Sequence, residues 1–180
     1  MAATLPLLIE RGPGVTTKQI AEAAGIAEGT IFRVFPDKEA VIEAALTLAF
    51  DSERTELAIA GIDRSLPFEE QLAEAVLVMQ RRHADIWRLV SSLGGPAALG
   101  RRGPTPPADL LALADLFEPE RHRLRHDPAT AAKELRALTL AVSHPALHAD
   151  EPMSPSEVVS LLLDGIRTPA SVRVAGGGRC

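Results

Sequence analysis

Several side chains between positions 17 and 38 are of the types that contact nucleic acids. Arg and Lys bind phosphate oxygens and the acceptor edges of bases, and backbone N–H and hydroxyl groups also bind phosphates. An exposed aromatic ring can lie along a sugar or against a thymine methyl group. These residue types at this spacing predict recognition of duplex DNA, through the following candidate contacts: Thr17, Lys18, Gly29, Thr30, Phe32, Arg33 and Lys38.

Two short helices joined by a tight turn must hold these candidates, over the sequence TTKQIAEAAGIAEGTIFRVFPDK (16–38). Thr16 or Thr17 can cap the first helix, because a threonine hydroxyl accepts a hydrogen bond from an otherwise unpaired backbone N–H. Gly25 follows where a chain leaving a helix often needs a left-handed residue. We expect the second helix to run from about Ala27 to residue 35, where Pro36 ends it. This layout is that of a helix-turn-helix motif.

Apolar spacing decides which face of the second helix looks outward. Ile31 and Phe35 lie four positions apart and are expected to point inward, whereas Thr30 and Arg33 point outward. A major groove is about 12 Å wide and admits one helix, so a reading helix must project from its support. The purely structural alternative is a tight three-helix corner with solvated polar residues.

The segment IAEAAGIAEGTIFRVFPDKEAVIEAAL (20–46) resembles the signature of TetR-family transcriptional regulators in residues and in order. The segment ALTLAVSHPALHADEPMSPSEVVSLLLDGI (137–166) resembles the last two helices of that family. The resemblance implies an all-α fold with an N-terminal three-helix helix-turn-helix DNA-binding domain (1–48, its first helix shortened). A C-terminal helical ligand-binding and dimerisation domain (49–167) is expected to follow. Residues 168–180 lack periodicity, and we expect a disordered tail there.

The same resemblance implies a function and partners. Members of the family are homodimers that bind near-palindromic double-stranded operator DNA, and a small-molecule effector relieves that binding. We therefore expect a transcriptional regulator, more specifically a repressor, and not an enzyme. The expected partners are operator DNA, a small-molecule effector and a second copy of the chain.

Two positions depart from the family pattern. Ala27 stands where Ser or Thr is usual, so the second helix lacks a side-chain cap worth about 1 kcal/mol. Glu28 replaces a residue that is commonly neutral or basic; its charge suits the helix dipole but repels a nearby phosphate. These departures favour an alternative function, a dimeric helical ligand-binding protein with weak or lost DNA binding.

Composition is that of a soluble globular protein, with 46% hydrophobic and 24% charged residues among 180. The net charge is −5, and residues 1–50 hold four basic against six acidic side chains. DNA binding must therefore depend on the charge of the docking face and not on the sum. Cys180 is the only cysteine, so an intrachain disulfide is excluded. Without a signal peptide or an apolar run of about 18 residues, we expect a cytoplasmic protein with no membrane association and no cofactor.

Apolar periodicity predicts further helices over 37–60, 68–93, 108–117, 128–143 and 154–167, with a flexible loop or lid over the Gly- and Pro-rich residues 94–107. Core packing explains the apolar stripe of the 68–93 helix unaided. A ligand pocket is the sharper hypothesis, because aromatic and sulfur-bearing side chains with one polar group often line such cavities. The candidate ligand-binding residues are Met79, His83, Trp87 and Phe117.

The last two predicted helices are more apolar than one small domain can cover. This excess favours a two-fold bundle with a second subunit. The alternative is that both helices face only their own core. The candidate interface residues are Leu135, Leu138, Val142, Val158, Leu161 and Leu162.

Histidine pairs at helical spacing, His122 with His126 and His144 with His148, are the sequence's candidates for a metal site. Pro145 breaks the helical geometry that the second pair needs, and the first pair lies in an Arg-rich segment. The sequence also lacks a Gly-rich phosphate loop, a G-x-S-x-G motif and a Cys pair. We expect no metal site and no catalytic residues.

Overall fold

The computed structural model describes residues 4–95, 110–144 and 153–168, and within these ranges it contains helices and no strands. The predicted loop or lid at 94–107 falls almost entirely outside these ranges, as do Pro145, His148 and nearly all of the predicted tail. The all-α fold class is confirmed. The elements in chain order are α1 (Thr4–Arg11), η1 (Gly12–Gly14), α2 (Thr17–Ala24), α3 (Glu28–Ile31), α4 (Lys38–Phe50), α5 (Glu53–Ala60), α6 (Phe68–Ser92), α7 (Leu111–Phe117), η3 (Glu118–Arg123), α8 (Pro128–Val142) and α9 (Pro155–Ile166).

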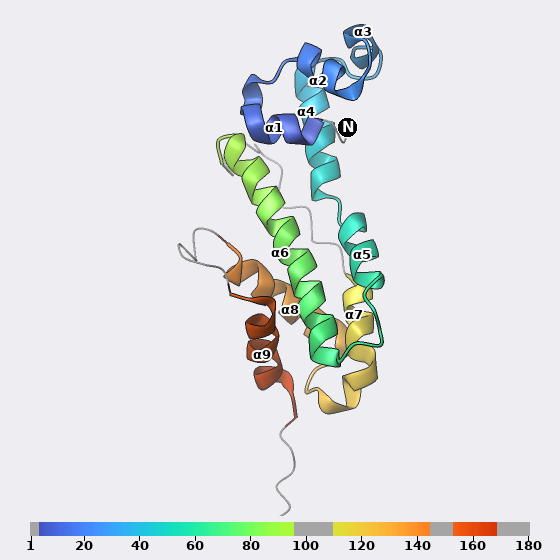
Figure 1. Ribbon diagram of the computed structural model, residues 1–180, viewed down its shortest axis with the longest axis vertical. Coiled ribbons are helices and arrows are strands. Elements are labelled where there is room, and N and C mark those ends of the chain that lie inside the picture. Colours follow the sequence, from blue (N-terminus) through green and yellow to red (C-terminus); the bar gives the residue numbers. More distant parts are fainter. Residues whose placement is uncertain (1–3, 96–109, 145–152, 169–180) are drawn as a thin grey trace, which may run out of the picture.

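The helices gather at two ends of an elongated molecule (Figure 1). We call α1 to α4 the head, and α5 to α9 the body. Helix α6 runs most of the length of the molecule, and its last turns reach α1. No helix in the described ranges has the length and apolar character needed to cross a membrane.

Local sequence explains where most helices begin. Thr16 caps α2 through a capping box with Gln19: the Gln19 backbone N–H donates to the Thr16 hydroxyl (3.2 Å), and the Thr16 N–H donates to the Gln19 side chain (3.0 Å). Asp37 accepts a bond from the Ala40 N–H (2.8 Å) at the start of α4. Ser154 and Glu157 form the same reciprocal box at α9. These caps replace water as partners of the first N–H groups of each helix.

The body has its own apolar core. Helix α6 supplies its central strip, and α7, α8 and α9 pack around it. Phe117 is fully buried, and its ring meets that of Phe68 edge to face, with centroids 5.8 Å apart. Other fully buried members of this core are Leu72, Val76, Leu113, Leu135 and Val158.

A second core fills the head, and it is completed from outside the first 50 residues. Leu89 and Leu93, at the end of α6, pack into the cluster that holds Leu8, Ile31 and Val41. The head core thus includes side chains from beyond residue 48, and the domain boundary at that residue stays a prediction. The end of α6 therefore covers part of the apolar surface of the head.

Close backbone contact fixes this junction between α6 and the head. The Ser92 hydroxyl donates to the Leu8 carbonyl (2.9 Å). Gly12 adopts a left-handed conformation (φ 58°), and a Cβ at Gly12 would lie 2.4 Å from the Ser92 carbonyl oxygen. Only glycine meets both conditions without strain.

The single helix predicted over 37–60 is wrong, because the structure divides it into α4 and α5. Asp51 is extended (φ −64°, ψ 131°) and ends α4. The Arg82 guanidinium, from α6, donates to the carbonyls of Phe50 (2.7 Å) and Asp51, and to the Thr55 hydroxyl (3.2 Å). The break is therefore stabilised by a side chain distant in sequence, which replaces the bonds that a continuous helix would make.

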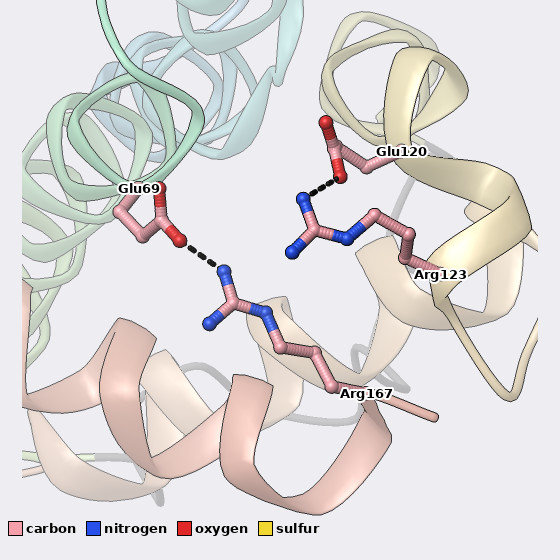
Figure 2. Close-up of polar contacts among 4 residues, drawn as sticks. All are labelled: Glu69, Glu120, Arg123 and Arg167. Atoms are coloured by element: carbon pink, nitrogen blue, oxygen red, sulfur yellow. Dashed lines mark hydrogen bonds and ion pairs between the residues drawn. The ribbon is translucent and has the colours of Figure 1, made fainter. Parts of the chain in front are cut away.

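At the opposite end of the body, an ion pair joins the chain's last described residues to α6 (Figure 2). Arg167, directly after α9, pairs with Glu69 in the first turn of α6, and Arg123 pairs with Glu120 (2.8 Å) within η3. The Arg125 N–H donates to the Ile166 carbonyl (2.8 Å), and the Thr168 N–H donates to the Arg123 carbonyl (2.9 Å). The hydrogen bond from Arg167 is the main cause that lowers the pKa of Glu69 below its usual value.

Candidate nucleic-acid interface

The turn between α2 and α3 has the geometry that the sequence predicted. Gly25 is left-handed (φ 66°, ψ 31°), and the Ile26 N–H donates back to the Ala21 carbonyl (3.0 Å). This bond satisfies a carbonyl at the end of α2 while the chain reverses direction. Gly25 is therefore required for its conformation and not for close packing, since a Cβ there would meet no atom within 4 Å.

Helix α3 is shorter than the predicted 27–35. It covers Glu28–Ile31, and turn residues follow to Val34, although the Phe35 N–H still donates to the Ile31 carbonyl (2.9 Å). Ala27 is extended and offers no side-chain cap. The missing cap that the sequence showed thus coincides with a helix of little more than one regular turn.

The orientation of α3 agrees with the apolar spacing. Ile31 is 4% exposed and packs in the head core, and Phe35 is half-buried against it. Thr30 and Arg33 are exposed, and Phe32 and Val34 are 50% and 70% exposed. The outer face of α3 and its following turn therefore offers a hydroxyl, a guanidinium and apolar surface together.

Other candidate contacts lie beside this face, and they differ in whether they already have hydrogen-bond partners within the head. Lys18 and Gly29 are exposed. Lys38 is half-buried, and its ammonium donates to the Pro13 carbonyl (2.9 Å), which ties the start of α4 to η1. Thr17 is half-buried, and its hydroxyl donates to the Glu28 carboxylate (2.5 Å). Lys38 and Thr17 thus already have partners within the head.

Glu28 lies next to this face and is not among the candidate contacts. It lies exposed at the first position of α3, where its carboxylate meets Thr17. The departure from the family pattern at this position was the sequence signal that pointed to it. Its negative charge stands beside the outer face that carries Arg33, so it opposes phosphate approach there.

Three of the four candidate ligand-binding residues lie on α6 and Phe117 lies on α7, and the four occupy two different environments. Met79 and Phe117 are fully buried in the body core. His83 and Trp87 are half-buried further along α6, where the Trp87 ring lies 4.4 Å from the ring of His144. None of these candidates lines the small cavity between α7 and α8 or the larger one between the head and α6.

His83 has an unusual environment for a titratable group. Its Nδ1 is buried without a hydrogen-bond partner among the described residues. Burial is the main cause that lowers the pKa of His83 to about 4, and the positive charges of Arg82 and Arg136 contribute. The ring is therefore neutral at pH 7.

The larger cavity, of about 380 Å³, lies instead between the head and α6. Helices α1, α4, α5 and α6 all contribute to its wall, and Arg54, Arg81 and Arg82 lie along it. Sequence reasoning missed this site. The available signal was the pair of adjacent arginines, Arg81 and Arg82, within the predicted 68–93 helix.

The candidate interface residues also divide by exposure. Leu135 and Val158 are fully buried in the chain's own core, Val142 and Leu162 are almost fully buried, and Leu138 is half-buried. Leu161 is 53% exposed, and Leu140 on α8 is 50% exposed. The outward-facing apolar surface of α8 and α9 thus centres on Leu140 and Leu161.

The described residues contain no group of three or more His, Cys, Asp or Glu side chains that could hold a metal ion. His126 pairs through Nδ1 with Glu134 (2.8 Å), whereas His122 is exposed.

A short exposed helix held after a glycine turn on a three-helix support defines a helix-turn-helix protein. Residues 1–45 match the sequence model of the family described as bacterial regulatory proteins, tetR family. Over 46 residues the chain is 46% identical to the HTH-type transcriptional regulator YvkB of Bacillus subtilis. That match covers 25% of this chain and 24% of YvkB.

Solved structures resemble the chain over nearly its whole length. A putative TetR-family transcriptional regulator from Vibrio parahaemolyticus is 23% identical with a TM-score of 0.56, and the match covers 93% of this chain and 96% of that one. A protein solved in work on the control of antibiotic production by a bacterial hormone is 21% identical with a TM-score of 0.65, covering 92% and 94% of the two chains. These likenesses establish the fold. The match over residues 1–45 and the YvkB match show that the N-terminal quarter of the chain is similar to bacterial regulatory proteins of the tetR family.

Proposed function

We propose that the chain is a cytoplasmic homodimer that binds near-palindromic operator DNA through α3 and represses transcription until a small molecule relieves that binding. The exposed outer face of α3, with Thr30 and Arg33 directed away from the head core, carries this proposal. The proposed contacts are those of the sequence: Thr17, Lys18, Gly29, Thr30, Phe32, Arg33 and Lys38.

Each residue type suits a particular part of the duplex. Arg33 reaches a base edge or a phosphate, and Thr30 and the Gly29 backbone approach a phosphate closely. Lys18 adds a positive charge at the start of α2, where exposed N–H groups also favour an anion. The exposed apolar groups of Phe32 and Val34 fit thymine methyl groups.

Dimerisation is proposed through the outward surface of α8 and α9, centred on Leu140 and Leu161. Leu138 borders this surface, while Leu135, Val142, Val158 and Leu162 support it from the core. Two heads related by a two-fold axis then place their α3 helices in successive major grooves, roughly 34 Å apart. The expected operator is accordingly two inverted half-sites about one helical turn apart.

Selection of binding sequences from random duplex DNA tests this function. We expect enrichment of an inverted repeat whose half-sites are spaced by about one turn, bound by two chains per duplex. The proposal is contradicted if selection enriches no sequence and the protein has no measurable affinity for duplex DNA. This outcome would favour the second candidate function, a dimeric ligand-binding protein without DNA binding. The negative charge of Glu28 beside the reading face supports that alternative.

A further inference from the structure

The cavity at the junction of head and body combines an apolar wall with basic side chains. Its apolar wall comes from both parts of the molecule: Leu5 and Ile9 on α1, Leu48 on α4, and Ile86 and Leu89 on α6. Leu48 and Ile9 are 39% and 37% exposed, so the wall is open to an incoming molecule. The cavity's volume of about 380 Å³ lies in the range of small-molecule sites.

The charged side chains of the cavity differ in whether they already have partners. Arg82 is committed to the carbonyls at the end of α4, and Asp85 is hydrogen-bonded to Arg88. One Asp51 carboxylate oxygen accepts a bond from the Glu53 N–H (3.1 Å). By contrast, Arg54 and Arg81 are exposed, and neither guanidinium has a hydrogen bond or ion pair with another residue of the described ranges.

We propose that this junction cavity binds a small amphipathic organic anion. The apolar part of the ligand lies against Ile9, Leu48 and Ile86, and its carboxylate or similar acidic group binds Arg54 and Arg81. A guanidinium binds a carboxylate through two parallel charge-assisted hydrogen bonds, which a neutral alcohol of the same shape cannot replace. Removal of the ligand's apolar chain from water supplies the remaining affinity.

The position of the site gives the ligand a consequence. The occupant touches α1 and α4 of the head and α5 and α6 of the body, the same elements that Arg82 and Ser92 hold together. A ligand here therefore favours whichever spacing of head and body fits it best, and only differential affinity for two such arrangements shifts their populations. This consequence rests on the proposed operator binding, whereas the binding of the anion itself does not.

Calorimetric titration with sodium octanoate and with 1-octanol, in the absence of DNA, tests the site. We expect octanoate to bind once per chain and at least about tenfold more tightly than octanol. The double variant R54Q/R81Q is expected to lose this preference, and L48Q to weaken both ligands. The matched control R64Q, an exposed arginine outside the cavity, should keep wild-type binding.

Because Arg54 and Arg81 are exposed, we expect the variants to fold, and the helical circular dichroism signal of each variant checks this. Equal affinity for octanoate and octanol overturns the proposal, as does an equal effect of R54Q/R81Q and R64Q. If octanoate binds but does not change the affinity for operator DNA, the anion site is supported and its role as the effector site is contradicted. If selected DNA never binds, the proposed function fails while the octanoate result still decides the cavity.

Discussion

The Thr17 hydroxyl donates a hydrogen bond to the Glu28 carboxylate across 2.5 Å, and this bond joins the first turn of α2 to the first turn of α3. It links the two helices, although the first N–H groups of α3 have no side-chain cap because Ala27 offers none. The same bond holds a negative charge beside the face proposed to read DNA. Glu28 therefore helps to order the reading helix but lowers its affinity for phosphate.

Replacing Glu28 with Gln separates these two effects. The amide oxygen can still accept the Thr17 hydroxyl, but the negative charge is gone. We expect E28Q to bind DNA more tightly by about 0.5–1 kcal/mol at low salt, because repulsion of a nearby phosphate is relieved. Fluorescence anisotropy with a selected duplex measures this, and E74Q on α6 serves as the control. Weaker binding by E28Q would mean that the carboxylate itself makes a favourable base contact.

Replacing Arg33 with Ala tests the principal contact of the reading face. The side chain is exposed, so its loss leaves the head core intact. We expect operator affinity to fall by about 1–3 kcal/mol, with Arg64→Ala unchanged. Competition binding on the selected duplex provides the measurement. An affinity equal to that of the wild type removes Arg33 from the interface.

Replacing Gly12 with Ala tests the contact between α6 and the head. The new Cβ would clash with the Ser92 carbonyl, and the left-handed backbone adds strain. We expect the free energy of unfolding in urea to fall by about 1–3 kcal/mol. Gly14→Ala is the matched control, because a Cβ there meets no atom within 4 Å and its φ is not positive. Equal stability of the two variants would show that the backbone at Gly12 and Ser92 can move apart without lowering the free energy of unfolding.

His83 predicts a pH dependence of stability. Its folded pKa of about 4 lies below the unfolded value near 6.5, so the unfolded chain binds the extra proton between these values. The contribution of His83 to the free energy of unfolding is therefore fully present above pH 6.5 and is lost as the pH falls toward 4. We expect about 1 kcal/mol of this loss between pH 7 and pH 5, after allowance for the partly exposed ring.

Urea unfolding at pH 7 and pH 5 measures this loss. H83Q, which has no titratable ring, should show a correspondingly smaller drop, while H122Q at an exposed position should behave like the wild type. The same drop in H83Q as in the wild type would assign the pH dependence to other groups.

Features with a local cause could be predicted from the sequence. The Thr16, Asp37 and Ser154 caps, the Gly25 turn and the inward face of α3 all depend on residues within five positions of one another. The same holds for the long helix α6, whose apolar stripe repeats at helical spacing.

Features with a distant cause could not be predicted. Nothing near Asp51 announces the break between α4 and α5, because the Arg82 guanidinium that stabilises it comes from α6. Leu89 and Leu93 look like ordinary members of the α6 stripe, yet they close the head core. The cavity beside them arises only where four helices meet, so its lining residues are spread from Leu5 to Leu89.

The dependence of DNA binding on salt tests most directly whether the outer face of α3 engages a duplex. With Lys18 and Arg33 from two heads near phosphates, we expect the logarithm of the binding constant to fall linearly with the logarithm of salt concentration, with a slope of about −2 to −4. R33A should make this slope shallower. A flat salt dependence, or the same slope in wild type and R33A, would contradict the account.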